Sequence, residues 1–188
     1  AGSGRGTWRK IILGTANAYE SIDMAPRGDS RPTWTGDISD MPQVPASRYD
    51  TVVCHQVLEH VRFPARAVAE FFRVISPGGT LIVSVPHLSR RHELPHDYQR
   101  FTQEGLDALL SDAGFERIEV RHHGGLLSFI HHQTSFIVPG MLLGVPLIGG
   151  LAFAVNAAFS WLFDAMDRLV DRHGLMPLGV VAVARKPA

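Results

Sequence analysis

A dense group of titratable side chains stands in the stretch VPHLSRRHELPHDYQRF, residues 85–101. A largely neutral imidazole can accept a proton near pH 7 from a group that is about to react. We therefore predict that His92 or His96, oriented by Asp97, is a general base. The alternative is that the DYQRF stretch forms a structural corner whose side chains satisfy loop backbone.

Metal binding is a second chemistry that this stretch offers, because His92, Glu93 and His96 are close in sequence. They lie in a predicted loop and no second ligand pattern supports them, so we do not expect a metal site. Glu59 and His60 are expected to pair locally at a helix start and to be structural. Four further histidines either line the opening of the site formed by residues 85–101 or are polar caps on apolar packing: His122, His123, His131 and His132.

Glycines at the start of the chain, AGSGRG, predict a nucleoside site. Gly2 and Gly4 would let the backbone approach a nucleoside closely, and TWRKIIL would be the helix that leaves this loop. Asp23 follows about twenty residues later, the separation at which an acid reaches a ribose hydroxyl pair. Two alternatives stay open: a linker remnant, or a dinucleotide loop, for which the third glycine, Gly6, comes one residue early.

The alternation of short β-branched runs with amphipathic stretches predicts an α/β domain with a parallel sheet and helices on both faces. Pro64 should start one helix, which SPGG stops, and Thr102 should cap the next. Ile118 and Val120 should point inward from their strand. Strands are expected at 18–23, 48–54, 79–85, 116–121 and 178–186. Ligands of such sheets bind at the carboxyl ends of the strands, so the residues directly after each strand are the main candidates for ligand binding.

Residues 122–163 contain no Asp, Glu, Lys or Arg. Polar residues then recur every three or four positions and predict an amphipathic helix with a wide apolar face: Asn156, Ser160, Asp164, Arg168 and Asp171. We expect 133–172 to be a helical insertion within a single domain, 1–188, lying on a membrane surface or over a lipophilic acceptor. A transmembrane span is not expected, because the flanking strands return to one sheet. The alternative is packing on its own domain or in a homodimer.

The composition excludes several classes of partner. Lys plus Arg and Asp plus Glu each total 18, so the formal net charge is zero and no net positive electrostatic field attracts nucleic acid. Cys54 lies in an apolar run and is expected to be buried rather than nucleophilic. The first residues lack the layout of a secretory signal, so we expect a cytoplasmic protein, peripheral to the inner face of the membrane if the apolar insertion meets lipid.

Three longer motifs carry a family resemblance: YDTVVCHQVLEHV, RVISPGGTLIVSVP and PHDYQRFTQEGLDALLSDAGF. Together with the glycine loop and the GD turn at Asp37, they resemble the class I S-adenosylmethionine-dependent methyltransferases of the methyltransferase type 11 group, over residues 1–125. The resemblance implies a Rossmann-like sheet, S-adenosyl-L-methionine as cofactor, and methyl transfer to a small or lipid-linked acceptor by in-line displacement.

The same resemblance assigns residues to the cofactor: Gly2 and Gly4 flanking its methionine part, Asp23 on the ribose hydroxyls, Asp37 with Ile38 at the adenine edge, and His55 with Gln56 beside the methionine moiety. Family members have a first strand that ends in an acid, followed by Gly-x-Gly-x-Gly, whereas this chain begins inside the loop. We therefore expect a longer natural protein in which an apolar strand ending in Asp or Glu, then a glycine, precedes Ala1.

A competing hypothesis is a noncatalytic membrane-surface or interaction protein that keeps the methyltransferase fold but does not bind cofactor. The ribose acid, the GD turn and the loop histidines occur together, which favours the enzyme.

Overall fold

The computed structural model describes all residues except 27, 136, 138–140 and 142–147. Its elements follow in chain order: α1 (Arg9–Leu13), β1 (Ile22–Asp23), β2 (Trp34–Thr35), β3 (Tyr49–His55), the 3-10 turn η1 (Leu58–His60), α2 (Pro64–Val74), β4 (Ile75–Pro86), α3 (Gln103–Asp112), β5 (Glu116–His123), α4 (Leu126–Thr134), α6 (Ile148–Val170) and β6 (Gly179–Arg185). The predicted α/β fold is confirmed. The strand expected at 18–23 is only two residues long, and β2 was not expected.

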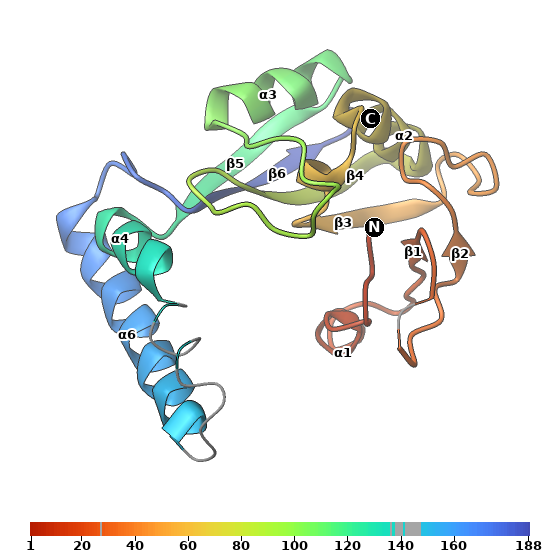
Figure 1. The fold of residues 1–188 in the computed structure, drawn as a ribbon. Helices are drawn as coiled ribbons and strands as arrows, with labels where there is room; N and C mark the ends of the chain where they lie inside the picture. The colour runs from red at the N-terminus through yellow and green to blue at the C-terminus, as the bar shows by residue number, and fades with distance from the viewer. Residues whose placement is uncertain (27, 136, 138–140, 142–147) are drawn as a thin grey trace.

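The main sheet has four strands in the order β3-β4-β6-β5, with α2 and α3 beside it (Figure 1). β3 and β4 are parallel, whereas β6 is antiparallel to both β4 and β5. The prediction of a parallel sheet is therefore wrong at the last strand. The cause is the connection: His123, which ends β5, pairs with Gly179, which begins β6, so the chain returns from the same end of the sheet.

Local sequence signals set the helices that cover this sheet. Pro64 begins α2, which ends at Val74, and the SPGG turn that follows lies inside β4. The side chain of Thr102 accepts a hydrogen bond from the backbone N–H of Gly105 and caps α3 as predicted. Ile118, expected to point inward, is 58% exposed. It lies on an edge strand, at an irregularity in the register between Arg117 and Glu119, which turns it outward.

A second, two-stranded parallel sheet, β1-β2, lies beyond β3. Within the described residues no strand pairs with both β1 and β3, and a hollow of about 70 Å³ lies between the sheets. The first residues bridge them, because the Ala1 nitrogen donates to the Val53 carbonyl at 2.6 Å and the Ser3 amide donates to the Ile22 carbonyl at 3.1 Å.

Glu20 makes a second bridge between the two sheets. Its carboxylate accepts hydrogen bonds from Arg48 and from the hydroxyl of Tyr49 in β3, both at 2.5 Å, and from the indole N–H of Trp34 in β2 at 3.1 Å. Arg48 and Tyr49 therefore hold the pKa of Glu20 down at about 2.

Helices α4 and α6 form an arm that projects from the sheet domain (Figure 1). Asp167, a buried residue of α6, joins them by accepting the backbone N–H groups of Leu127 and Ser128, each at 2.8 Å, at the start of α4. The helical segment begins earlier than the predicted insertion at 133–172, and parts of that range, 136, 138–140 and 142–147, lie outside the described residues. By length and composition alone, Gly149–Val170 could cross a membrane.

Candidate functional site

The glycine loop and Asp23 meet at the carboxyl end of β1. The Gly4 amide donates a hydrogen bond of 2.7 Å to Oδ2 of Asp23, whose side chain is largely buried. Gly2 has a φ of 63° and Gly4 a φ of 53°, a region that favours glycine. A Cβ on Gly2 would overlap the side chain of Val57, whereas a Cβ on Gly4 would meet open space. The loop therefore runs close to the protein on one side and is open on the other.

Asp37 and Ile38 lie just after β2, in the predicted turn. Oδ1 of Asp37 accepts hydrogen bonds from the backbone N–H and the hydroxyl of Ser39, at 2.8 and 2.7 Å, and Ile38 is buried. The Gly36 amide donates to the Asp23 carbonyl at 3.0 Å. This bond places the turn beside Asp23.

His55 and Gln56 stand at the carboxyl end of β3. Nδ1 of His55 contacts the hydroxyl of Ser84 in β4, and its ring lies edge-on to Trp8, with centroids 4.8 Å apart. Gln56 has a φ of 51°, which is strained for a residue with a side chain. Burial lowers the pKa of His55, with a contribution from His123, so its imidazole is neutral near pH 7.

A separate hollow of about 670 Å³ is lined by Arg5, Arg9, Asp29 and Arg31 among others, and includes none of the assigned cofactor residues. Its lining is largely polar and cationic. It lies beside the glycine loop, because Gly6 is part of its wall.

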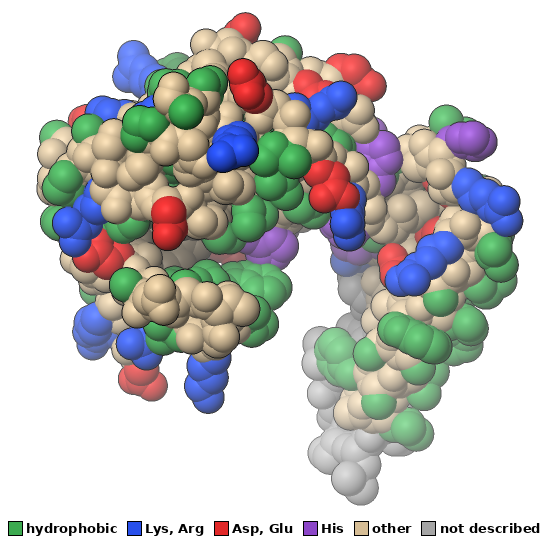
Figure 2. Space-filling view, turned by 180° about the vertical axis from the view of Figure 1, so that it is seen from behind, with side chains coloured by type: hydrophobic (Ala, Val, Ile, Leu, Met, Phe, Trp, Pro, Cys, Tyr) green, Lys and Arg blue, Asp and Glu red, His purple; other side chains and the backbone are tan. Residues whose placement is uncertain are grey.

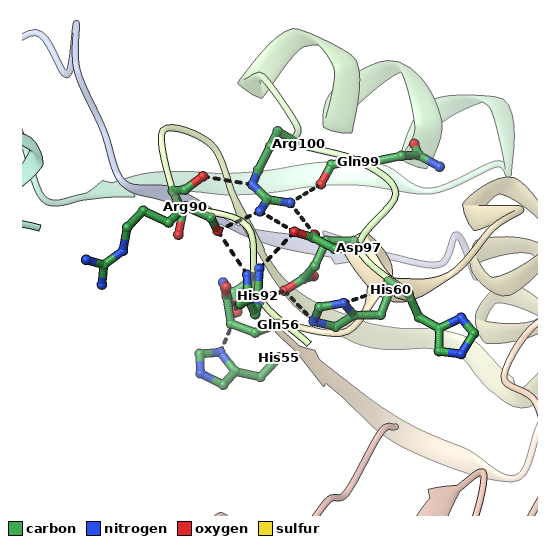
Figure 3. A network of polar contacts seen from close by, with 12 residues as sticks. His55, Gln56, His60, Arg90, His92, Asp97, Gln99 and Arg100 are labelled. Atoms are coloured by element: carbon green, nitrogen blue, oxygen red, sulfur yellow. Dashed lines mark hydrogen bonds and ion pairs between the residues drawn. The ribbon is translucent and has the colours of Figure 1, made fainter. Parts of the chain in front are cut away.

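The loop of residues 87–101 carries the predicted base, and Asp97 is its anchor (Figure 3). Both oxygens of Asp97 bind the guanidinium of Arg100, at 2.5 and 2.8 Å, and Oδ2 also accepts the backbone N–H of His92 at 2.9 Å. Arg100 holds the pKa of Asp97 far below its usual range. Asp97 thus shapes the loop and makes no hydrogen bond to the ring of His92 or of His96.

The two candidate imidazoles differ in their surroundings. Nδ1 of His96 lies 3.0 Å from the hydroxyl of Tyr98, and no hydrogen bond joins Nε2 to another described residue. His92 is more enclosed, because Nδ1 lies 3.2 Å from the carbonyl oxygen of Arg90 and Nε2 faces Oε1 of the buried Glu59 at 3.6 Å, beyond hydrogen-bond distance.

Two of the four later histidines also approach this region. Nε2 of His132 in α4 lies 3.4 Å from the hydroxyl of Ser89. Burial lowers the pKa of His132 and of His123, and His123 interacts with His55. His131 faces α6 within the arm, where its Nε2 lies 3.0 Å from the hydroxyl of Ser160.

Glu59 is the site residue whose environment sequence reasoning missed. It was expected to pair locally with His60, and it does lie 3.7 Å from that imidazole. However, it is fully buried and also faces His92 from the distant loop. Burial raises the pKa of Glu59. The only sequence signal was the position of VLEHV directly after a strand end.

Comparisons with known proteins show which family this chain resembles. Residues 1–120 match the family model of a methyltransferase domain. A probable S-adenosylmethionine-dependent methyltransferase of Mycolicibacterium smegmatis is 33% identical, and the alignment covers 100% of this chain and 80% of that protein. A ubiquinone biosynthesis O-methyltransferase of Psychrobacter arcticus is 32% identical over 92 residues, which is 40% of this chain and 36% of the relative.

A solved structure shares the fold at lower identity. The 1,6-didemethyltoxoflavin-N1-methyltransferase of Burkholderia thailandensis, in complex with 1,6-didemethyltoxoflavin and S-adenosylhomocysteine, superimposes with a TM-score of 0.60 at 15% identity. The match covers 100% of this chain and 69% of that protein.

Proposed function

Because this chain belongs to the S-adenosylmethionine-dependent methyltransferases, we propose that it methylates an oxygen or nitrogen of a small or lipid-linked acceptor held beside the loop of residues 87–101. The observation that carries the proposal is the hydrogen bond between the Gly4 amide and Asp23, which joins the open glycine loop to the ribose acid. The choice of oxygen or nitrogen follows the names of two similar proteins, one an O-methyltransferase and the other an N1-methyltransferase.

The residues of the glycine loop fit the cofactor. Only glycine at position 2 keeps the loop against Val57, and the space over Gly4 can admit a ligand. We assign the ribose hydroxyls to Asp23, the adenine edge to Asp37 and Ile38, and the methionine part to the loop, His55 and Gln56. Bound S-adenosyl-L-methionine supplies an electrophilic methyl group on a sulfonium.

The chain's own contribution to the reaction is to orient the acceptor and to remove its proton. We assign the general base to His96, because its Nε2 bonds to no other described residue whereas Nε2 of His92 faces the buried Glu59. Tyr98 orients the His96 ring through Nδ1. Asp97 and Arg100 hold the loop that carries it.

Two measurements test this function. Isothermal titration with S-adenosylhomocysteine should show binding, and a radiolabelled methyl group should pass to members of a panel of phenol, catechol and amine acceptors. The variant His96→Gln should keep cofactor affinity but lose about 100-fold in turnover, with the rise of rate with pH abolished. An unchanged pH profile in this variant contradicts the base assignment, and absence of cofactor binding favours the noncatalytic alternative.

We also propose that the arm lies on the cytoplasmic face of a membrane. One side of α6 exposes large apolar residues at helical spacing: Leu151, Val155, Phe159, Leu162, Met166 and Leu169. Figure 2 shows apolar side chains along the arm and charged ones gathered near the sheet domain. A bilayer surface accommodates such an amphipathic helix without spanning.

Co-sedimentation with phosphatidylcholine and phosphatidylglycerol vesicles tests the arm. The double variant Phe159→Asp with Leu162→Asp should stay in the supernatant, while the control Asn156→Asp, which adds one negative charge to the polar stripe of α6, should sediment like the parent. The membrane proposal is wrong if the parent stays in the supernatant and gel filtration shows a dimer that the double variant abolishes. In that case the arm is an interface between two copies of the chain.

A further inference from the structure

Three side chains of types that can bind a metal ion, Glu59, His60 and His92, lie close together near the carboxyl end of β3. Oε1 of Glu59 lies 3.7 Å from Nε2 of His60 and 3.6 Å from Nε2 of His92. The ligand atoms of the three residues all lie within 4.8 Å of one another. Glu59 and His60 come from η1, and His92 comes from the loop of residues 87–101; His60 and His92 are labelled in Figure 3.

Backbone carbonyls fix the protons on both imidazoles. Nδ1 of His60 lies 2.7 Å from the His96 carbonyl oxygen, and Nδ1 of His92 lies 3.2 Å from that of Arg90. A carbonyl oxygen can only accept, so each Nδ1 is the donor. In the neutral tautomer, each Nε2 then turns a lone pair toward Glu59.

The result is a cluster of acceptors that face one another without a donor. Glu59 is fully buried, and neither of its carboxylate oxygens has a hydrogen-bond partner among the described residues. A buried, unpartnered carboxylate is costly, so the cluster is stable only when a cation or a proton lies between these atoms. Arg100 attracts the Glu59 carboxylate electrostatically, but its guanidinium binds Asp97 and makes no hydrogen bond to Glu59.

We propose that Glu59, His60 and His92 bind a divalent transition-metal ion, with zinc the best chemical match. Two imidazoles and one carboxylate are a common zinc set that leaves a coordination position open. Metal-bound histidines typically donate the other ring N–H to a backbone carbonyl, as both do here. Bonds of about 2.0–2.2 Å in tetrahedral geometry separate ligand atoms by about 3.4 Å, close to the two distances from Glu59, and the two imidazole nitrogens, within 4.8 Å of each other, would have to approach one another on binding.

This site lies outside the residues assigned to S-adenosylmethionine, so it stands or fails separately from methyl transfer. It also gives VLEHV a chemical role, because Glu59 and His60 are adjacent in sequence and His92 completes the set from the loop. None of the three is the proposed base.

Metal binding is tested directly on the full chain. The protein is stripped with a chelator, dialysed against zinc, and analysed for bound metal; cobalt replaces zinc for visible absorption. We expect one ion per chain and cobalt bands that report nitrogen and oxygen ligands. His92→Gln, at a partly exposed side chain, should lower zinc affinity by about 100-fold or more, while the control His131→Gln should match the parent.

Two outcomes overturn the proposal. One is equal zinc affinity and unchanged cobalt bands in His92→Gln with native circular dichroism. The other is no bound metal together with an infrared carbonyl band of a protonated carboxyl that disappears in Glu59→Gln, which places a proton in the cluster. Cofactor binding by isothermal titration, measured on the same samples, separates failure of this site from failure of the proposed function.

Discussion

Asp23 offers the most direct test of how the chain holds its cofactor. Replacing it with asparagine keeps an oxygen that can accept the Gly4 amide, a hydrogen bond now 2.7 Å long, but removes the negative charge. Under the assignment above, the ribose hydroxyls then lose a charge-assisted partner. A hydrogen bond to a charged group contributes about 1.5–3 kcal/mol, which corresponds to about a 10- to 150-fold rise in the dissociation constant.

Replacement with alanine should cost more. Asp23→Ala removes the ribose partner and also leaves the Gly4 amide without its acceptor, in a loop whose left-handed glycines depend on that anchor. The Gly4 amide is partly buried, so the loss of its acceptor adds less than the full cost of about 1–3 kcal/mol for a buried donor. The order of affinity for S-adenosylhomocysteine should therefore be parent, Asp23→Asn, Asp23→Ala.

Isothermal titration with S-adenosylhomocysteine measures these affinities, and thermal unfolding of each variant without ligand checks the fold. His96→Ala is the control, because it lies on the acceptor side and should leave cofactor affinity nearly unchanged. If Asp23→Asn binds as tightly as the parent while His96→Ala weakens binding, the division into a cofactor side and an acceptor side is wrong.

Three further predictions concern stability. Asp167→Ala should cost about 1–3 kcal/mol, because Leu127 and Ser128 lose their acceptor at the start of α4; limited proteolysis should then cut the arm first, and uniform resistance refutes this. Glu20 has a folded pKa of about 2 against an ordinary 4.5, so its contribution to stability is complete above the higher value and lost as pH falls toward the lower one. Denaturant midpoints of the parent and Glu20→Gln should thus converge between pH 5 and about 2, and a constant gap contradicts the linkage. Thr102→Ala should destabilise by about 1 kcal/mol in urea unfolding through loss of the α3 cap, whereas Thr102→Ser should retain most of it.

The sequence by itself determined the features that depend on neighbouring residues. Pro64 at the start of α2 and Thr102 at the cap of α3 act within one helical turn. Val68 and Phe71, which are three positions apart in the sequence, are buried on one face of α2, and Cys54 is buried as its apolar run indicated. The motifs after the strands were sufficient for the family and the cofactor, because they are contiguous in the chain.

Only the tertiary structure decided which distant groups meet. The antiparallel direction of β6 follows from its pairing with β5 across the arm, and the outward turn of Ile118 follows from an irregularity in that pairing. The carboxylate of Asp97 binds the guanidinium of Arg100 rather than an imidazole, because a guanidinium donates to both carboxylate oxygens at once. The approach of His92 to buried Glu59 depends on a loop crossing a strand end, and no periodicity along the chain encodes such a contact between residues 33 positions apart in sequence.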